Sequence, residues 1–473
     1  MTTSEFLALI GRAPLIASSQ ASPGSPLATP ETLVQLAEAS LAEGVSVIRA
    51  EGVDAIREMR KAFENPLIGL IKRHYPGSEV YITATVAEVA ALLAEKCEVI
   101  ALDGTSRSRP DNAKLADLVA AIHTGGALAL ADCDSLESAR FAAAAGADFV
   151  ATTEAGYTDA PSTPGPDIEL VRRIAAESKV PVIAEGRYTE RWQVETALQA
   201  GASGVVVGGA LNDPVKQTAA LRPRFRTLER APVGAVDIGG TWLRYGIVSG
   251  DWKLQDHDKT PNPHDKGATI DWLRSAVKAS GVGRVGVSTA GIVDPATGEV
   301  WRAKEYLMPN YVGIVFNEAS LGVPTIAWGD GHATNWAHAC LPQFAGRRVI
   351  TLALGTGVGC GFVQHGQIWC GPRGEYPRIN DLTYETGKSF EDVLGGLHLT
   401  KDPTPEQEQV AVVALRAAVN AVRNLYFPDD VIIGGGVGTS DWLAPHVAAA
   451  GATVSPLGPD AGLYGAAALA LFM

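Results

Sequence analysis

Short apolar runs alternate with amphipathic stretches throughout the first half of the chain. The apolar runs between residues 14 and 209 read PLIASS, VSVIRA, LIGLIK, VIALD, LALAD, FVATT, VIAEG and VVVGG. The stretches between them are rich in Ala, Glu and Leu, and one opens with Thr29 as the expected N-cap and Pro30 at the first helical position. Strands that are apolar on both faces and alternate with helices form parallel sheets. Eight such units within about 220 residues predict a closed (β/α)₈ barrel.

The pattern changes after residues 222–232, a stretch rich in Arg and Pro that we interpret as a linker. The next segment, GAVDIGGTWLRYGIVSG, predicts two strands joined by a Gly-Gly turn, and such an antiparallel hairpin does not continue a parallel barrel. Further strands are expected at RVGVST, PTIAWGD, VITLALGTG and DVIIGGG, with a helix at EQEQVAVVALRAAVNAVRNLYF. Glycine clusters end three of these strands, which favours a cleft lined by backbone amides between two lobes. We therefore expect an α/β protein with one domain at residues 1–225 and another at 233–473.

The composition excludes several classes of protein. The chain has 473 residues, of which 46% are hydrophobic and 19% are charged, as in a globular protein. A formal net charge of −13 without any basic run argues against nucleic acid as the main partner. No apolar stretch approaches the roughly 18 residues of a membrane span and no secretory signal is recognisable, so we expect a cytoplasmic protein without a membrane partner. The five scattered cysteines form no CxxC pair, so neither a disulfide framework nor a cysteine metal pair is expected.

Polar residues gather at the carboxyl ends of the predicted barrel strands, where barrel enzymes carry their chemistry. These positions are Gln20, Arg49, Lys72, Asp103, Asp132, Thr153, Glu185, and Gly208 with Gly209. One polar strand end can equally be a helix cap or a solvated residue, and Asp103 taken alone fits either reading. A whole ring of such ends favours a shared site at one mouth of the barrel.

Two members of this ring suit acid and base catalysis. Lys72 and Glu185 follow the third and seventh strands and therefore lie on roughly opposite sides of the mouth. A carboxylate near cations such as Arg49 stays ionised, whereas a desolvated lysine loses its charge near neutral pH. This geometry suits inversion at a carbon beside a carbonyl, with deprotonation on one face and reprotonation on the other. The glycines after the last two strands, Gly186, Gly208 and Gly209, are typical of a site for a sugar phosphate.

Residues 13–214 resemble the N-acetylmannosamine-6-phosphate 2-epimerase family. The resemblance rests on SQASPGSPL, IRAEGV, GLIKRHYPGSEVYITAT, ALDGTSRSRPD, LADCDS, AGYT, VIAEGR and VVVGGAL. It implies that Lys72 and Glu185 are the acid/base pair. It also implies that Gln20, Arg49 and Asp132 orient the sugar, and it places Arg187 where the family accepts either Gly or Arg.

The second half contains three glycine-rich strand ends of the kind that bind phosphate. They are DIGGT at residues 237–241, LGTGVGCG at 354–361 and IIGGGVG at 432–438. Glycine permits tight turns and lets backbone amides reach phosphate oxygens, although three ordinary hairpin turns would read similarly. Phosphorylation of a hydroxyl also needs a carboxylate to accept its proton, and Asp330, after PTIAWG, is the candidate. The alternative is that Asp330 only caps the following helix.

Residues 233–472 resemble the ROK sugar kinases, and within them the N-acetylmannosamine kinases. DIGGT, GVSTAGIVDPATGEV, MPN, GDGHA, LGTGVGCGFV, GPRGEYPR and GLYGAAALA occur in the family's order. The resemblance implies a two-lobed actin-like ATPase domain that uses ATP with Mg²⁺. It places phosphate contacts at Gly239, Gly240, Thr241, Gly355, Thr356 and Gly357, nucleotide contacts at Gly434, Gly435 and Gly436, and sugar contacts at Asn310, Glu375 and Glu391.

The kinase half departs from the family's pattern in the segment that binds a structural zinc. Arg378 stands where the family has a zinc-binding His, and no cysteine follows Cys370. A tetrahedral zinc site cannot be built from the remaining residues, so we expect no metal there. Gly329 also replaces the Asn that usually precedes the catalytic Asp, which removes one hydrogen bond to a sugar hydroxyl.

These observations favour a bifunctional enzyme of amino-sugar catabolism, consistent with sialic acid breakdown. It would phosphorylate N-acetylmannosamine at its 6-hydroxyl and epimerise the product to N-acetylglucosamine 6-phosphate. The alternative is an active epimerase fused to a degenerate kinase-like module that binds sugar or nucleotide and regulates or scaffolds. A ROK repressor would need a helix-turn-helix before DIGGT, where the barrel stands. Both families commonly form dimers and tetramers, which implies a homo-oligomer.

Overall fold

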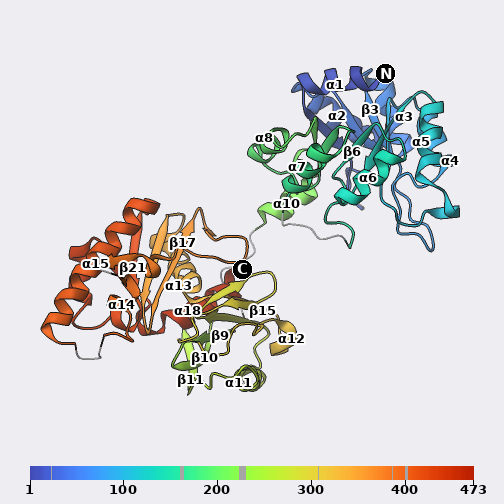
Figure 1. Cartoon of the computed structure of the whole chain (residues 1–473). Helices are drawn as coiled ribbons and strands as arrows, with labels where there is room; N and C mark the ends of the chain where they lie inside the picture. The colour runs from blue at the N-terminus through green and yellow to red at the C-terminus, as the bar shows by residue number, and fades with distance from the viewer. Residues whose placement is uncertain (23, 160–164, 223–230, 307, 386, 400–402) are drawn as a thin grey trace. The chain divides into compact units, whose positions relative to one another are not determined.

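The computed structural model describes residues 1–22, 24–159, 165–222, 231–306, 308–385, 387–399 and 403–473. The chain divides into two compact units, Met1–Arg222 and Pro223–Met473 (Figure 1). Most of the linker predicted at residues 222–232 lies outside the described residues. Each unit is described by itself below.

The described residues of the first unit form a closed, all-parallel barrel in which β1 pairs with both β2 and β8. Its strands are β1 (Leu15–Ser19), β2 (Ile48–Glu51), β3 (Leu67–Leu70), β4 (Val99–Asp103), β5 (Leu128–Asp132), β6 (Phe149–Ala151), β7 (Val182–Glu185) and β8 (Gly204–Val207). They are short and almost entirely buried, because helices cover their outer face and side chains fill the interior. The predicted (β/α)₈ barrel is confirmed.

Helices surround the barrel, as Figure 1 shows. They are α1 (Thr3–Arg12), α2 (Pro30–Ala42), α3 (Val53–Ala62), α4 (Val86–Ala94), α5 (Leu115–Thr124), α6 (Leu136–Ala144), α7 (Ile168–Glu177), α8 (Arg191–Gln199), α9 (Gly209–Asn212) and α10 (Pro214–Leu221), with a 3₁₀ turn at Pro110–Asn112. Thr29 caps α2 as the sequence predicts, because its hydroxyl accepts a hydrogen bond from Thr32 N. Helix α1 joins the inner core of the barrel, where Phe6 meets Phe149 edge-on at 5.1 Å between ring centroids.

The second unit is built around two mixed sheets. The strand order of the first is β11-β10-β9-β12-β15, from Leu254–Pro261, Trp242–Val248, Val233–Ile238, Val285–Thr289 and Thr325–Gly329. The order of the second is β18-β17-β16-β21-β22, from Gln367–Ile368, Val358–Gln364, Val349–Leu354, Asp430–Gly434 and Thr453–Val454. Short antiparallel pairs join β13 (Ile292–Asp294) to β14 (Glu299–Arg302) and β19 (Thr383–Glu385) to β20 (Lys388–Ser389). Strands β9 and β10 are antiparallel, which confirms the predicted hairpin.

Two buried helices join the sheets of the second unit. Helix α13 (Asp330–Ala339) packs on β16 and β17, α18 (Ala461–Phe472) packs on β9 and β12, and the two helices contact each other. Close approach requires glycine here: a Cβ on Gly286 of β12 would overlap the backbone of Ala466 in α18. The remaining helices are α11 (Lys266–Ser280), α12 (Glu318–Leu321), α14 (Phe390–Leu394), α15 (Pro405–Tyr426), α16 (Gly435–Gly438) and α17 (Ala444–Val447), with 3₁₀ turns at Pro342–Phe344, Ile379–Asp381, Ala448–Ala450 and Gly458–Asp460.

Within the described ranges, no helix has the length and apolar character needed to cross a membrane. The five cysteines, all in described segments, carry free thiols.

Candidate active sites

The carboxyl end of the barrel holds a buried charged cluster centred on Arg49. Arg49 Nη2 lies 2.6 Å from Asp132 Oδ2, and Nη1 lies 3.3 Å from Glu185 Oε2. Both Arg49 and Asp132 are fully withdrawn from water, with exposed fractions of 1% and 0%. Arg49 Nε and Nη1 have no hydrogen-bond partner among the described residues. Nε is therefore a buried donor without a protein partner, and Nη1 faces the Glu185 carboxylate as an ion pair.

Thr153 connects the two carboxylates of this cluster. Its Oγ1 lies 2.6 Å from Asp132 Oδ1 and 3.0 Å from Glu185 Oε2. A hydroxyl has a single hydrogen, so the Thr153 hydroxyl can donate to only one of the two carboxylates at a time. When Glu185 is protonated, Glu185 can instead donate to Thr153 Oγ1 while Thr153 donates to Asp132. Burial raises the pKa of Glu185 to about 7, while Arg49 opposes the shift. Glu185 can therefore gain and lose a proton near neutral pH.

Lys72 lies at the same mouth, directly beyond β3. Its Nζ donates a 2.7 Å hydrogen bond to Gln20 Oε1, and Gln20 Nε2 donates to Ser18 Oγ at 2.9 Å. Although the residue as a whole is exposed, loss of water around the ammonium and the nearby charge of Arg49 lower the pKa of Lys72. Strands β3 and β7 are four strands apart in the closed barrel, so Lys72 and Glu185 approach its axis from opposite sides. The mouth thus brings together the predicted residues Gln20, Arg49, Lys72, Asp132 and Glu185.

The glycines predicted to bind phosphate lie directly after β7 and β8. Gly186 has φ of +107°, which a residue with a Cβ rarely adopts, and Arg187 follows with φ of 61°. The Arg187 guanidinium lies 6.0 Å from the centroid of the Tyr157 ring. Gly208 precedes α9 and Gly209 begins it. The role of the three glycines in binding phosphate, and of Arg187 in binding substrate, stays a prediction.

A further acidic residue at this mouth, besides Asp132 and Glu185, was missed by the sequence analysis. Glu154 is 1% exposed and follows Thr153 directly. It accepts hydrogen bonds from Tyr81 Oη at 2.9 Å and from Arg107 Nη2 at 3.1 Å. Burial, with a contribution from Asp132, raises the pKa of Glu154 to about 7. The available signal was a charged residue directly after the predicted apolar run FVATT, three residues beyond the observed end of β6.

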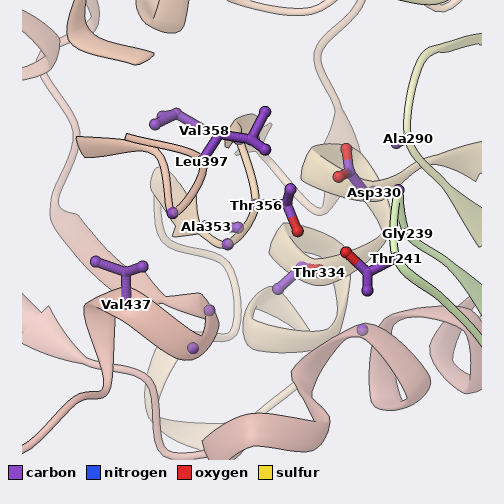
Figure 2. Close-up of a pocket in the computed structure, with 18 of the residues that line it drawn as sticks. Gly239, Thr241, Ala290, Asp330, Thr334, Ala353, Thr356, Val358, Leu397 and Val437 are labelled. Atoms are coloured by element: carbon purple, nitrogen blue, oxygen red, sulfur yellow. The ribbon is translucent and has the colours of Figure 1, made fainter. Parts of the chain in front are cut away.

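The second unit contains a cavity of about 1440 Å³ onto which all three glycine segments open (Figure 2). The predicted residues that line it are Gly239, Gly240, Thr241, Asp330, Gly355, Thr356, Gly357, Glu391, Gly435 and Gly436. In Figure 2 the side chains of Thr241, Thr356 and Asp330 gather around one part of this space, although they come from separate segments of the chain. Gly434, which ends β21, is not among the lining residues.

Asp330 is the first residue of α13, at the end of β15. The N-cap position belongs to Gly329, and Asp330 Oδ1 accepts a 2.7 Å hydrogen bond from Gly331 N. Burial raises the pKa of Asp330 to about 7, and the negative charges of Asp237 and Glu391 add to the shift. A carboxylate with this pKa can accept a proton from a hydroxyl near neutral pH.

Glu391 is bound on both of its oxygens by protein groups. Oε1 accepts from Lys304 Nζ and from Tyr306 Oη, each at 2.6 Å. Oε2 accepts from Val358 N at 3.1 Å and from Asn380 Nδ2 at 3.3 Å. Burial alone would raise the pKa of Glu391, but these bonds outweigh it and lower the pKa. Glu391 therefore has no oxygen to spare for a sugar hydroxyl while Lys304 and Tyr306 stay in place.

The other two predicted sugar contacts do not line the large cavity. Asn310 is exposed, has φ of 63° and lines a separate cavity of about 400 Å³ with Asp265, Lys266 and Glu305. Glu375 Oε2 accepts a hydrogen bond from Arg373 N at 2.8 Å. The roles of Asn310 and Glu375 as sugar contacts therefore stay predictions.

Two cationic residues at the large cavity were not predicted to take part. Arg244 Nε donates to Asp237 Oδ2 at 2.9 Å, and its Nη1 lies 3.2 Å from Asp460 Oδ1. Arg244 faces Asp237 directly across the β9–β10 hairpin, so the register of that hairpin was the available signal. Lys304 Nζ also lies 2.9 Å from Asp381, which pairs in turn with Arg378. In the described part of the chain, no three His, Cys, Asp or Glu side chains are grouped so as to hold a metal ion.

Comparisons with known proteins agree with this division of the chain. Residues 33–222 match the family model "Putative N-acetylmannosamine-6-phosphate epimerase", and residues 233–382 match the ROK family. The chain is 31% identical over 503 residues to the "Bifunctional enzyme NanE/NanK" of Brucella melitensis biotype 1, covering 97% of this chain and 96% of the relative. The chain belongs to the NanE/NanK family of bifunctional enzymes. The predicted order of an epimerase domain followed by a ROK kinase domain is confirmed.

Relatives of the separate halves are also found. The barrel of this NanE/NanK family member is 42% identical over 205 residues to the "Putative N-acetylmannosamine-6-phosphate 2-epimerase" of Clostridium perfringens strain SM101, covering 43% of this chain and 93% of the relative. The solved N-acetylmannosamine-6-phosphate 2-epimerase from Clostridium perfringens is 40% identical, with a TM-score of 0.45, and covers 46% of this chain and 94% of its own. A putative N-acetylmannosamine kinase from Listeria monocytogenes is 18% identical, with a TM-score of 0.44, and covers 50% of this chain and 97% of its own.

Proposed function

We propose that the chain phosphorylates N-acetylmannosamine at its 6-hydroxyl and epimerises the product to N-acetylglucosamine 6-phosphate. In this proposal residues 1–225 form the epimerase domain and residues 233–473 form the kinase domain. The family membership supports both activities, and the chemistry of the two sites supports the substrates.

The epimerase reaction exchanges one proton on carbon 2 of the open-chain sugar phosphate, next to the C1 carbonyl. One of Lys72 and Glu185 removes the proton to leave an enolate, and the other returns a proton to the opposite face. The positive charge of Arg49, beside Glu185 at the mouth, supports stabilisation of the carbonyl oxygen, where negative charge develops. The opposed positions of a lysine with lowered pKa and a carboxyl group with pKa near 7 carry this proposal.

A decisive test of the epimerase step follows carbon 2 in deuterium oxide. Replacing Lys72 by Met should reduce epimerisation of N-acetylmannosamine 6-phosphate by about 10²- to 10⁴-fold, the usual cost of losing one general acid or base. Binding of the 6-phosphate should persist in this variant. Wild-type epimerisation and exchange in Lys72→Met would refute the assignment of the pair.

The kinase reaction needs a base, a phosphate cradle and a divalent cation. Asp330 accepts the proton of the sugar 6-hydroxyl as its oxygen attacks the γ-phosphorus, ADP leaves, and Asp330 then releases the proton to water. The fit to a nucleotide rests on the glycine segments that line the cavity: a Cβ on Gly435 would overlap the Leu354 backbone, so only glycine lets this segment pack against β16. Asp237, which lines the cavity, supplies oxygen atoms of the kind that suits Mg²⁺, which would neutralise charge on the phosphates.

A kinase-like module that binds nucleotide without transferring phosphate is the second candidate. It is favoured by one observation: Asn310 and Glu375 lie outside the cavity and both oxygens of Glu391 are occupied. Measuring ADP formation from ATP, in the presence of Mg²⁺ and each of a series of N-acetylhexosamines, distinguishes the two candidates. The proposed kinase forms ADP with N-acetylmannosamine, and Asp330→Asn abolishes this activity while leaving epimerisation intact. Absence of ADP formation with every sugar would support the binding module instead, whereas undiminished ADP formation in Asp330→Asn would refute Asp330 as the base.

A further inference from the structure

Glu154 is a buried carboxylate at the barrel mouth that the proposed proton transfer does not use. Its two oxygens are divided between two neighbours, with Oε1 bound by Tyr81 Oη and Oε2 bound by Arg107 Nη2. An ionised carboxylate that is 1% exposed is costly unless such bonds satisfy it. The neighbours of Glu154 indicate why a carboxylate is buried at this position.

Tyr81 belongs to the hairpin that carries Lys72. Residues 71–73 pair with residues 81–83 through an antiparallel bridge between Lys72 and Ile82. Arg73 N donates to the Tyr81 carbonyl and Thr83 N donates to the Ile71 carbonyl, each at 2.8 Å. The backbone of Lys72 is therefore tied to the strand on which Tyr81 lies. An interaction that fixes Tyr81 therefore also restricts the backbone position from which the Lys72 side chain extends.

On its other side Glu154 is tied to the rigid barrel. Arg107 Nη2, which binds Glu154, also lies 2.7 Å from Asp103 Oδ2 at the end of β4. The residue before Glu154 is Thr153, whose hydroxyl lies 3.0 Å from Glu185. Thr153 and Glu154 are therefore linked to different members of the proposed acid/base pair. Thr153 contacts Glu185 directly, whereas Glu154 binds Tyr81 on the hairpin that carries Lys72.

We propose that Glu154 is a positioning residue that fixes Lys72 relative to Glu185 by holding the Tyr81 hydroxyl. This inference rests on the proposed epimerase function and deepens it. Proton transfer to a carbon requires close alignment, and misplacing a reacting group by about 1 Å costs on the order of 10²-fold in rate. The hydrogen bond between Tyr81 and Glu154 thus supports catalysis without contact with the substrate.

The test compares two tyrosine-to-phenylalanine variants of the same hairpin in the full-length chain. Tyr81→Phe removes only the hydroxyl that binds Glu154. Tyr75→Phe is the matched control, because Tyr75 Oη also binds a glutamate, Glu88 Oε1 at 2.7 Å, but on α4 rather than at the barrel mouth. Each variant is assayed for epimerisation and for exchange of the carbon-2 proton in deuterium oxide, starting separately from N-acetylmannosamine 6-phosphate and N-acetylglucosamine 6-phosphate.

We expect Tyr81→Phe to lower kcat by about ten- to a hundredfold with little change in KM. With the epimer whose carbon-2 proton faces Glu185, exchange of that proton for deuterium should continue without inversion. The reason is that Glu185 still removes and returns protons on its own face of the sugar. Glu154→Gln should show the same pattern, and Tyr75→Phe should match the unmutated enzyme. A purely structural role would instead reduce exchange from both epimers together with the melting temperature.

The inference fails if Tyr81→Phe keeps full epimerisation while Lys72→Met is inactive, because Lys72 would then need no such support. It also fails if both Tyr81→Phe and Tyr75→Phe lose activity equally. Full activity in Lys72→Met would refute the proposed acid/base pair itself, so the two failures are distinguishable. Should Glu154→Gln not fold, Tyr81→Phe decides alone, since it leaves both buried charges in place.

Discussion

Arg49 Nη1 lies 3.3 Å from Glu185 Oε2, inside the mouth of the barrel. The Arg49 side chain is 1% exposed and the Glu185 side chain is 14% exposed, so little water screens this contact. Burial raises the pKa of Glu185 to about 7, and the positive charge of Arg49 prevents a further rise. The balance of the two effects leaves Glu185 able to exchange protons near neutral pH.

Replacing Arg49 by Met should therefore change both the pH dependence and the stability of the barrel. Without the guanidinium the pKa of Glu185 rises, so the acid side of the epimerase pH profile should move to higher pH. Asp132, which is fully buried, loses its partner, and breaking a buried pair in this way costs about 3–5 kcal/mol. Urea unfolding and pH–rate profiles measure the two effects.

Arg57→Met is the control, because Arg57 pairs with Asp54 and Glu95 at the surface and its side chain is 46% exposed. Its loss should leave both the urea midpoint and the pH profile nearly unchanged, because exposed ion pairs contribute little to stability. Equal effects of the two substitutions would contradict the role given to Arg49.

The epimerase of the unmutated chain should have a bell-shaped pH profile. In both directions of the reaction, Lys72 and Glu185 must hold one proton between them. The pair carries two protons below the pKa of Glu185, so activity should fall as the pH drops through about 7. It carries none above the pKa of Lys72, which lies below its usual value, so activity should also fall at alkaline pH. A profile that stays flat well below pH 7 would be inconsistent with Glu185 as one of the two groups.

Glycine at position 331 should be required for the kinase and not for the epimerase. A Cβ there would lie 2.7 Å from Cys360 N and would push α13 away from β17, displacing Asp330 at the start of the helix. Gly331→Ala should therefore reduce kinase activity by about 10²-fold, given the sensitivity of catalysis to alignment. The control is Gly283→Ala, because nothing lies within 4 Å of a Cβ at that position. Kinase activity that survives Gly331→Ala would mean that Asp330 does not need its observed position.

The purified chain should contain no stoichiometric zinc. Arg378, at the position of the family's zinc-binding His, pairs with Asp381. Chelators should therefore leave the melting temperature unchanged, whereas a structural zinc site loses its folding energy when the metal is removed. Kinase activity should still depend on added Mg²⁺. Elemental analysis that finds about one tightly bound zinc per chain would contradict this prediction.

The barrel site could largely be predicted from the sequence, because strand order dictates where each strand end lies. Once the apolar runs are assigned to consecutive parallel strands, Gln20, Lys72 and Glu185 must meet at one mouth. Glu154 escaped notice because it lies in a loop, three residues beyond the end of β6. No periodicity indicates whether such a loop side chain turns inward.

The kinase site could be predicted only in part. The glycine segments could be located because each follows a strand, and Asp330 because it lies between a strand and a helix. The partners of Glu391 could not, since Lys304 and Tyr306 come from a loop whose path depends on packing rather than on a local pattern. The positions of Asn310 and Glu375 outside the cavity could not be predicted either, because they also depend on packing rather than on a local pattern.

We propose that one chain performs both reactions in succession. Incubating the purified, unmutated chain with N-acetylmannosamine, ATP and Mg²⁺ in deuterium oxide, and following the sugar by NMR, tests both reactions at once. We predict that N-acetylglucosamine 6-phosphate accumulates with deuterium at carbon 2, and that Asp330→Asn blocks its formation from N-acetylmannosamine while still converting added N-acetylmannosamine 6-phosphate. Failure to form any phosphorylated sugar, or a phosphorylated product that keeps its original proton at carbon 2, would contradict the account.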